Sequence, residues 1–426
     1  MTSRFIGLGL AVALILEMST AACRDRTTGA DTEPVQAAPP IIRVTPDQAD
    51  QLAALVAEAP ALSTILLEDG LYQSDLESES QRRLIFRRPG VTLKSASGRA
   101  EAVVIDGQYR TGELLFVLAA NVVVADLTLT RSIDHLIHVS TPGAEAVTGV
   151  QLRNLRLIDG GEQFVKINAG GQGGFVDDGL VEDCFFQLTE EGRPHIERQP
   201  GGCYTGGIDA HAARGWIVRG NHFRDIYCAG EGLAEHAVHF WRSSRDTQVE
   251  NNHIINCARG IGFGLDDTQE ARVYADDPYP GIRPIAHFDG LIRNNVIFAA
   301  IPWYDTGIEL HYARGAQVYH NTVVSTTAAS GFFSSIDYRF PPTQVRIYNN
   351  LTRRITRRAE GEADLQANLQ DTPLSYFANA EEGDFHLVAS ANRAIDQGLV
   401  VAGAGLDLDG TPHDRGSGPD LGADER

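Results

Sequence analysis

A short pattern of apolar and polar positions recurs through the middle of the chain. Each copy has an apolar residue, two further residues, a pivot residue and then more apolar residues. The copies are VADLTL (124–129), LRNLRL (152–157), VEDCFF (181–186), VRGNHF (218–223), VENNHI (249–254), IRNNVI (292–297), VYHNTV (318–323) and IYNNLT (347–352). Successive pivots are 26 to 43 residues apart, about 32 on average. Strand-sized apolar segments at such a variable interval are typical of a β-solenoid in which each copy belongs to one turn.

The pivot residues indicate one register for the whole stack. They are Leu127, Leu155, Cys184, Asn221, Asn252, Asn295, Asn321 and Asn350. Stacked asparagine side chains can hydrogen-bond up and down a column, and asparagine also tolerates the left-handed backbone of a tight corner. The five successive asparagines therefore predict a ladder along one corner of the solenoid.

A second strand precedes each pivot segment. These strands are IHVS (137–140), VKIN (165–168), IDAH (208–211), VHFW (238–241), IGFG (261–264), IELH (308–311) and IDYR (336–339). Strict alternation points their apolar residues inwards and the others outwards, and equivalent residues of a parallel stack lie about 4.8 Å apart. The first outward column is then His138, Lys166, Asp209, His239, Gly262, Glu309 and Asp337, and the second is Ser140, Asn168, His211, Trp241, Gly264, His311 and Arg339.

The two ends of the chain have features that close a solenoid. In TPDQADQLAALVAEAP (45–60), Thr45 is suited to cap a helix and Pro46 to occupy its first position. Such a helix can cover the strand edges of the first turn. We therefore expect a signal peptide over 1–22, a polar tether over 23–40, the β-helix with its capping helix over 41–380, and a C-terminal cap or tail over 381–426.

These repeats resemble a known fold family. The asparagine ladder is similar to that of pectate-lyase-like right-handed parallel β-helices. The stretches YTGGIDAHAARGW (204–216), LAEHAVHFW (233–241) and INCARGIGFG (255–264) resemble a group of secreted bacterial β-helix proteins to which no firm activity is attached. The resemblance implies an all-β, single-stranded right-handed parallel β-helix that binds its ligand along one strand face. It does not imply a particular chemistry, because this fold carries lyases, hydrolases and inert proteins.

Charge and composition exclude some functions. The net charge is −20, whereas a nucleic-acid binder needs a basic face. Arginine supplies nearly all positive charge, and Lys94 and Lys166 are the only lysines in the sequence. We therefore expect no nucleic-acid partner.

The first residues have the pattern of an export signal. Arg4 precedes the apolar run FIGLGLAVALIL, which is too short to span a membrane. The following STAAC resembles a bacterial lipoprotein cleavage site, although Glu17 and Thr20 depart from the usual pattern. This implies cleavage before Cys23 and a lipid on its sulfur. We expect an exported protein, either an envelope lipoprotein held to the membrane only by that lipid or a secreted protein.

The remaining cysteines are expected to meet an oxidising compartment. Cys184, Cys203, Cys228 and Cys257 allow three pairings. Cys203 and Cys228 are the preferred pair because both lie in glycine-rich connecting segments. No CxxC spacing exists, so we expect no structural zinc site.

The two outward columns are rich in side chains that can bind a ligand or take part in catalysis. Their fourteen positions carry four of the 13 histidines, together with Lys166 and Trp241. A surface that is merely solvated rarely carries so many titratable groups, so we predict a binding or catalytic face. Gly262 and Gly264 should open space in the middle of the columns. Insertions at 190–204 and 266–287 should wall a cleft on either side.

Several chemistries fit this face. A sugar chain suits Trp, His and carboxylates, and a polysaccharide lyase needs a base and a cation; the candidates are Lys166, His211, His239, Arg242 and Arg259. A glycoside hydrolase needs two carboxyls, for which Glu309 and Asp337, about 4.8 Å apart by strand spacing, are candidates. A metal could instead use Asp209, His211 and His239. Asp209 should also raise the pKa of His239.

The sequence therefore favours an exported polysaccharide-active protein, with a lyase preferred. A glycoside hydrolase and a non-catalytic carbohydrate-binding protein are the alternatives. The predicted catalytic residues are Lys166, Asp209, His211, His239, Glu309 and His311. The predicted substrate-binding residues are Asn168, Trp241, Arg242, Gly262, Gly264, Asp337 and Arg339. We expect a monomer without a metal at these residues. Calcium is the one candidate cofactor, because Asp407 and Asp409 form a DLDG motif that we otherwise expect to be a solvated cap.

Overall fold

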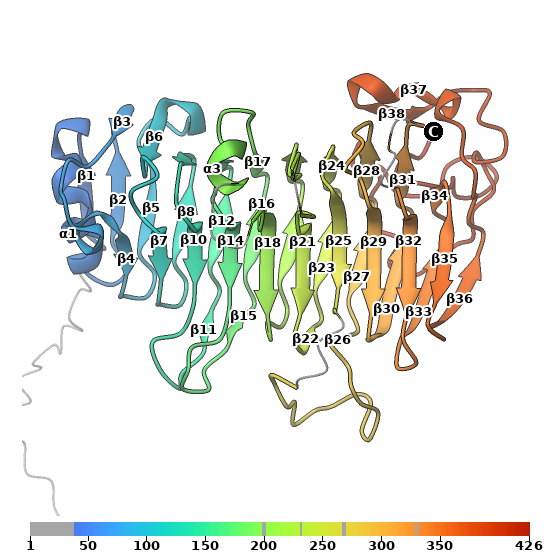
Figure 1. Ribbon diagram of the computed structural model, residues 1–426, viewed down its shortest axis with the longest axis horizontal. Coiled ribbons are helices and arrows are strands. Elements are labelled where there is room, and N and C mark those ends of the chain that lie inside the picture. Colours follow the sequence, from blue (N-terminus) through green and yellow to red (C-terminus); the bar gives the residue numbers. More distant parts are fainter. Residues whose placement is uncertain (1–37, 198–201, 231, 266–269, 328, 330–331) are drawn as a thin grey trace, which may run out of the picture. The chain divides into compact units, whose positions relative to one another are not determined.

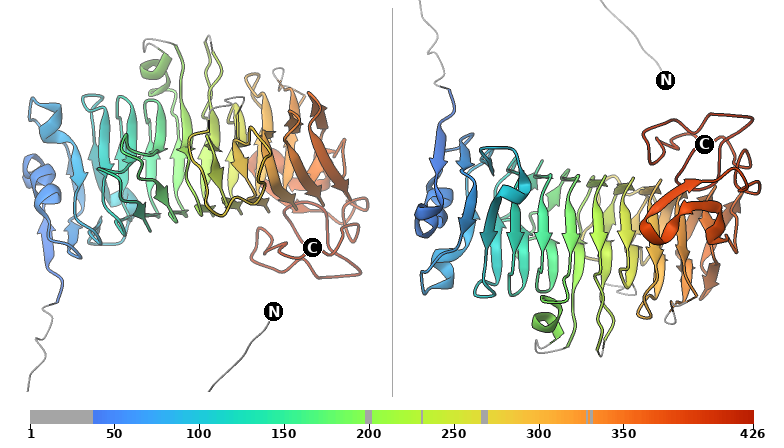
Figure 2. Two further views of the ribbon diagram at one scale, coloured as in Figure 1. Left: turned by 90° about the horizontal axis from the view of Figure 1, so that it is seen from below. Right: turned by 90° about the horizontal axis from the view of Figure 1, so that it is seen from above.

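Short parallel strands are stacked along one axis in a computed structural model of the protein (Figures 1 and 2). The structure describes residues 38–426 except 198–201, 231, 266–269, 328 and 330–331, and residues 39–426 form one compact unit. The predicted signal peptide, Cys23 and most of the tether lie outside the described residues. Each turn contributes a strand to three parallel sheets, which we call sheets A, B and C. The fold is a right-handed parallel β-helix, as the repeats predicted.

Sheet A holds β1 (Ile41–Val44), β2 (Thr64–Leu67), β5 (Thr92–Ser95), β8 (Val123–Ala125), β12 (Gln151–Arg153), β16 (Leu180–Glu182), β19 (Ile217–Arg219), β23 (Gln248–Glu250), β27 (Leu291–Arg293), β30 (Ala313–Tyr319), β33 (Gln344–Tyr348) and β36 (Glu362–Gln366), with the short β22 (Ser244–Arg245) and β26 (His287–Phe288) at one side. Sheet B holds β3 (Gly70–Tyr72), β6 (Val103–Asp106), β9 (Thr128–Thr130), β13 (Arg156–Ile158), β17 (Phe185–Gln187), β20 (His222–Arg224), β24 (His253–Ile255), β28 (Val296–Ala299), β31 (Thr322–Ser325) and β34 (Leu351–Thr352).

Sheet C holds β4 (Leu84–Phe86), β7 (Glu113–Val117), β10 (His135–Val139), β14 (Gln163–Ile167), β18 (Gly206–His211), β21 (His236–Trp241), β25 (Arg259–Phe263), β29 (Thr306–His311), β32 (Ser334–Arg339) and β35 (Ile355–Arg358). Two small sheets pair β11 (Val147–Thr148) with β15 (Val176–Asp177), and β37 (Phe377–Asn379) with β38 (Asp384–Leu387). The helices are α1 (Ala49–Glu58), α2 (Glu79–Arg82) and α3 (Arg193–Glu197), with 3-10 turns η1 (Pro46–Gln48), η2 (Ala100–Ala102), η3 (Leu374–Tyr376) and η4 (Ala380–Glu382).

The N-terminal helix forms at the position that the sequence predicted. Thr45 precedes the turn, Pro46 opens it, and α1 follows directly. Leu52 and Val56 are buried against the first strands. The helix therefore covers the apolar interior of the first turn.

The asparagine ladder is confirmed and extends one turn further. From Asn221 to Asn350, each side-chain Nδ2 donates to Oδ1 of the next asparagine at 2.9–3.0 Å. The same Oδ1 accepts the backbone N–H of the asparagine before it, at 2.9–3.1 Å. Asn350 donates in the same way to Asn368. Leu127, Leu155 and Cys184 fill the column with buried apolar groups in the earlier turns.

Each pivot segment consists of two strands and a corner. In VENNHI, for example, β23 ends before the pivot and β24 begins after it. The residue before each pivot has a positive φ, as at Asn251 and Asn294. The left-handed position is therefore the neighbour of the pivot, where asparagine, aspartate and glycine are tolerated. The pivot asparagine provides the side-chain ladder.

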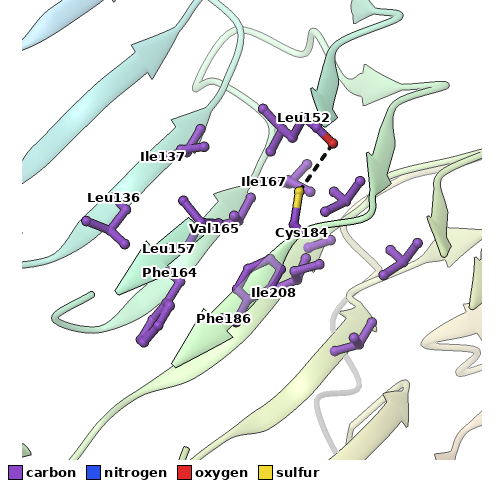
Figure 3. Close-up of a cluster of buried hydrophobic side chains, with 14 of the residues drawn as sticks. Leu136, Ile137, Leu152, Leu157, Phe164, Val165, Ile167, Cys184, Phe186 and Ile208 are labelled. Atoms are coloured by element: carbon purple, nitrogen blue, oxygen red, sulfur yellow. Dashed lines mark hydrogen bonds between the residues drawn. The ribbon is translucent and has the colours of Figure 1, made fainter. Parts of the chain in front are cut away.

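Inward side chains of all three sheets form one continuous core. Figure 3 shows part of it, where Leu152, Leu157, Phe164, Val165 and Phe186 meet at the centre of the turns. The buried Cys184 thiol points to the carbonyl of Leu152 at 3.6 Å. This rigid stack fixes the position of every outward residue on sheet C.

The DLDG motif of the C-terminal tail is only partly the solvated cap that the sequence predicted, because Asp407 is buried and Asp409 is exposed. The last parallel strand ends at Gln366, and the tail then packs beside the corner between sheets A and B (Figure 2). Asn251, Asn294 and Asn349 donate from Nδ2 to tail carbonyls at 2.7–2.8 Å. Asp407 is buried, and its carboxylate accepts backbone N–H groups of Asp409, Thr411 and Glu425. The buried Asp407 therefore closes the turn of the DLDG motif, whereas Asp409 and Gly410 are exposed.

Within the described part of the chain, no helix has both the length and the apolar character needed to cross a membrane.

Candidate functional site

The first outward column lies in register on sheet C. Strand pairing places His138, Lys166, Asp209, His239, Gly262, Glu309 and Asp337 directly beside one another. In the second column, His211 pairs with Trp241, and His311 pairs with Arg339. The repeated acid–apolar–His segments therefore occupy the same face of sheet C.

A third outward column was missed in the sequence. It contains Glu113, His135, Gln163, Gly206, His236, Arg259, Thr306 and Ser334. Two consecutive residues point inwards after it, such as Phe164 and Val165, which are both in the core. Strict alternation, assumed from the sequence, would have pointed His236 into the core. The repeated pairs of apolar or small residues at this position, such as AV (237–238) and GI (307–308), were the available signal.

Asp209 is the centre of the first cluster. Lys166 donates a short hydrogen bond from Nζ to Asp209 Oδ2. His211 Nε2 lies 3.1 Å from the same oxygen and 3.3 Å from Lys166 Nζ. Trp241 donates from its indole Nε1 to Asp209 Oδ1 at 2.7 Å. Three neighbouring strands thus supply donors to one buried carboxylate.

The charge state of Asp209 follows from these partners. Burial alone would raise its pKa, but the hydrogen bond from His211 and the positive charge of Lys166 outweigh it. The pKa of Asp209 is therefore held well below its usual range. Asp209 stays ionised and fixes the positions of Lys166 and His211.

His239 lies beneath this cluster. Its Nδ1 is 3.7 Å from Asp209 Oδ1, its Nε2 is 3.1 Å from the carbonyl of Gly264, and its ring stacks on Trp241. Burial and the nearby His236 lower its pKa well below the ordinary value. Asp209 does raise the pKa of His239, as expected, but desolvation and His236 outweigh this effect, so the pKa is lowered overall. His239 is 2% exposed, so it supports the site from below and does not face a ligand.

The expected gap at the two glycines is not open. The ring of His236 fills the space over Gly262, since a Cβ there would lie 2.8–2.9 Å from the ring atoms. Gly264 has a φ of +76°, and a Cβ there would collide with the carbonyl of His311. These glycines therefore make room for protein groups, and the prediction of ligand space above them is wrong.

His236 connects the first cluster to a second. Its ring centroid is 4.4 Å from that of His239, and its Nε2 is 2.7 Å from Glu309 Oε2. Burial would raise the pKa of Glu309, but the hydrogen bond and charge of His236 hold it far below its usual range. A ladder of ionisable groups therefore runs without interruption across the strands.

The second cluster joins Glu309, His311, Asp337 and Arg339. His311 Nε2 lies 3.1 Å from Asp337 Oδ1 and 4.0 Å from Glu309 Oε1. Arg339 Nε is 2.6 Å from His311 Nε2 and 3.6 Å from Asp337 Oδ1. Glu309, His311 and Asp337 are almost completely buried, so a substrate cannot touch them directly in this arrangement.

The reachable groups surround the first cluster. His211, Trp241, Asn168 and Arg242 are partly exposed there, whereas Lys166 is buried just beneath them, and Arg339 is partly exposed at the second cluster. Asn168 Oδ1 is 3.0 Å from Nε2 of His138, and the Arg242 guanidinium lies 5.2 Å from the centre of the Trp241 ring. The sequence suggested Asp209, His211 and His239 as ligands for a metal. Both carboxylate oxygens of Asp209 instead accept hydrogen bonds, from Lys166 and from Trp241.

Tyr204 was not foreseen as a site residue. It is 43% exposed and lies two residues before β18. Burial, with the negative charges of Asp209 and Glu235, raises the pKa of Tyr204 to about 12. The sequence showed that Tyr204 follows Cys203, but it did not show the electrostatic effect of Asp209 on Tyr204.

The insertions lie at opposite ends of the sheet C strands. Figure 1 shows α3 above these strands and the segment 270–286 below them. A disulfide joins Cys203 to Cys228, the pair preferred from the sequence, and so connects the loops before β18 and β21. On the other side, Arg272 pairs with Asp177 at 2.7 Å and holds the lower insertion against the solenoid. Loops therefore flank the middle of the face.

Comparisons with known proteins support the fold. No family model and no curated protein matches the sequence. The chain is similar to the crystal structure of pectate lyase Pel9A, with a TM-score of 0.60, 15% identity, and coverage of 91% of this chain and 96% of that one. Weaker likenesses include a lacto-N-biosidase from Eubacterium ramulus (TM-score 0.46, 9% identity, 78% of this chain and 66% of that one) and a polygalacturonase from Erwinia carotovora (TM-score 0.41, 10% identity, 80% and 97%). The similarity to Pel9A establishes a pectate-lyase-like β-helix.

Proposed function

We propose that this protein is an exported polysaccharide-active enzyme, and specifically a lyase that acts on a uronate-containing chain at the Asp209 cluster. One observation carries the proposal. An ionised Asp209 holds Lys166 and His211 together, beside the partly exposed Trp241, between loops on both sides of a strand face. Strongly shifted pKa values at Asp209 and His239 favour an enzyme over a passive binding surface.

The geometry gives each residue a role in β-elimination. His211 Nε2–H donates to Asp209, which leaves Nδ1 as the base that removes the proton next to the uronate carboxylate. The released electron pair forms a carbon–carbon double bond as the bond to the leaving oxygen breaks, and that oxygen takes up a proton. Lys166 supplies positive charge for the substrate carboxylate. The Trp241 ring offers an apolar surface to a sugar ring, and Tyr204, whose raised pKa keeps it protonated, is the proposed proton donor to the leaving oxygen.

The hydrolase alternative is less favoured by the same geometry. A glycoside hydrolase needs one carboxyl that keeps its proton and one that is ionised. Glu309 has a pKa far below its usual range, and Asp337 is buried beside His311 and Arg339. Neither residue is therefore suited to act as the acid.

Product analysis on a panel of uronate polysaccharides tests the proposal. A lyase releases unsaturated products that absorb ultraviolet light, a hydrolase releases reducing ends without that absorbance, and a binding protein releases neither. His211→Ala should abolish turnover with little loss of stability, because His211 is partly exposed. His222→Ala is the matched control, since His222 is an exposed strand histidine on sheet B. Full activity of His211→Ala on the identified substrate would refute the assignment.

Export belongs to the same proposal. The apolar run after Arg4 and the STAAC segment support cleavage before Cys23 and a lipid on its sulfur. Mass spectrometry of the membrane fraction should find a lipid-modified Cys23 at the mature N-terminus. A soluble product that retains Met1 would contradict it, and a soluble product cleaved in this region would indicate plain secretion.

A further inference from the structure

Three side chains with metal-ligand chemistry converge at one end of the ladder. Glu309 and His311 come from β29, and Asp337 is the register partner of Glu309 on β32. One donor atom of each lies within 4.8 Å of the other two. The relative exposures of the three residues are 3%, 0% and 0%, so the donor atoms meet in the protein interior. Rigid parallel pairing holds the three Cα positions fixed.

The guanidinium of Arg339 occupies the point where these atoms converge. Its Nε lies 2.6 Å from His311 Nε2 and 3.6 Å from Asp337 Oδ1, and its Nη2 lies 3.9 Å from Glu309 Oε1. Arg339 is a long side chain at the edge of the cluster, with 22% of its side chain exposed. It can therefore rotate towards solvent without moving the strand, and this rotation opens a path to the three donor atoms.

The contacts of His311 cannot all be favourable in this arrangement. If Nε2 carries no proton, its lone pair accepts from Arg339 but faces the oxygen of Asp337 at 3.1 Å. If Nε2 is protonated, it donates to Asp337 but confronts the N–H of Arg339 at 2.6 Å. With Asp337 ionised, either protonation state of Nε2 leaves one repulsive contact. A compact cation held by Nε2 and Oδ1 together removes this conflict.

The surroundings of Asp337 Oδ2 and of Glu309 resemble those of metal ligands. Asp337 Oδ2 is buried and has no hydrogen-bond partner within the described residues; its nearest cation is Arg358 Nη1 at 3.8 Å. His236 holds Glu309 Oε2 at 2.7 Å and leaves Oε1 directed to the cluster. An outer histidine that orients a ligating carboxylate is a regular feature of metal sites.

We propose that Glu309, His311 and Asp337 bind a first-row divalent transition metal such as Zn²⁺, with Arg339 displaced to solvent when the ion is bound. An imidazole nitrogen beside two carboxylates suits such an ion better than Ca²⁺, which prefers oxygen ligands. The double charge of the ion replaces the guanidinium in balancing the two carboxylates. The site is distinct from the Asp209 cluster, and the inference does not depend on lyase activity.

Titration of the full mature chain with Zn²⁺ by calorimetry, after removal of metals, tests this site. One tight equivalent is expected, with much weaker binding of Ca²⁺. His311→Gln and Asp337→Asn should weaken Zn²⁺ binding by about 10–100-fold or more, and His236→Gln by about 10–100-fold. Arg339→Ala should bind Zn²⁺ more tightly than the wild type, because the competing cation is gone.

A second histidine and carboxylate cluster provides the matched control. His386, Asp409 and Asp424 also lie close enough to hold an ion, on the exposed side of the tail. His386→Ala should leave the tight Zn²⁺ equivalent unchanged. Co²⁺ loading should give visible absorption bands that disappear in His311→Gln and persist in His386→Ala.

The decisive variant is Arg339→Ala, since its side chain is partly exposed and its fold can be verified by circular dichroism. If folded Arg339→Ala binds Zn²⁺ no more tightly than the wild type, the proposal fails and the cluster is an ion-pair network alone. Loss of the tight equivalent in His386→Ala would equally overturn it. A Zn²⁺ equivalent without any lyase activity would leave this inference standing and reject only the proposed function.

Discussion

At the scale of single residues, Gly262 leaves the space on the outer face of sheet C that the ring of His236 fills. The imidazole lies across the position where a side chain at 262 would stand, and it reaches Glu309 from there. Without the glycine, the ladder would break into two separate clusters. The glycine is required here for space, because its backbone does not have a positive φ.

Replacement of this glycine tests the arrangement. In Gly262→Ala, a new methyl group meets the buried ring of His236, so we expect a loss of about 1–3 kcal/mol in the free energy of unfolding. Urea denaturation measures it. Gly171→Ala is the control, since a Cβ there meets nothing within 4 Å and its φ is not positive. Equal stability of the two variants would contradict the packing described.

Sequence patterns located some site residues and missed others for a clear reason. Alternation correctly placed Lys166, Asp209 and His239 in one column, because the strands are regular there. It failed for His236, since two successive residues turn inwards where the chain enters sheet C. Burial was also unpredictable, because it depends on neighbouring turns and loops. The sequence therefore indicated which residues share a face but not which of them a ligand can reach.

At the scale of elements, the corner between sheets A and B depends on the ladder. Asn295 donates to Val249 O and Asn321 Oδ1, and its own Oδ1 accepts from both the backbone and the side chain of Asn252. The repeat of asparagines made this corner predictable. Asn368 was missed although its segment, LQANLQ (365–370), has the same apolar spacing around the pivot as IYNNLT (347–352).

Replacement of one asparagine of the ladder should lower the free energy of unfolding. Asn295→Ala leaves buried backbone and side-chain groups without partners, at roughly 1–3 kcal/mol for each unpaired group. Asn368→Ala, at the partly exposed end, should cost less because water can replace the lost contacts. Chemical denaturation of both variants gives the comparison. A larger loss at Asn368 than at Asn295 would show that the ladder does not stabilise the middle of the solenoid.

At the scale of the whole molecule, acidic pH acts on buried histidines in several elements. Burial lowers the pKa of His135, His253 and His413 to about 4, and of His287 and His320 to about 3. In the unfolded chain these groups return to values near 6.5. The unfolded state therefore binds more protons between about pH 6.5 and 4, and acidification favours unfolding over that range. Glu425 opposes this trend, because burial raises its pKa to about 7.

We expect the free energy of unfolding to fall as the pH drops below about 6.5, because these five buried histidines take up protons only on unfolding. Two variants with opposite signs test the cause. His253→Asn removes a histidine whose pKa is lowered in the folded state, so the free energy of unfolding should decrease less steeply as the pH falls. His386→Asn removes a histidine whose pKa is raised, first by its hydrogen bond to Asp384, so it loses a group that favours folding at low pH. The free energy of unfolding of His386→Asn should therefore decrease more steeply as the pH falls. Urea midpoints measured from pH 7.5 to 4.5 for the three proteins decide the matter, and parallel curves would exclude these histidines as the origin of the pH dependence.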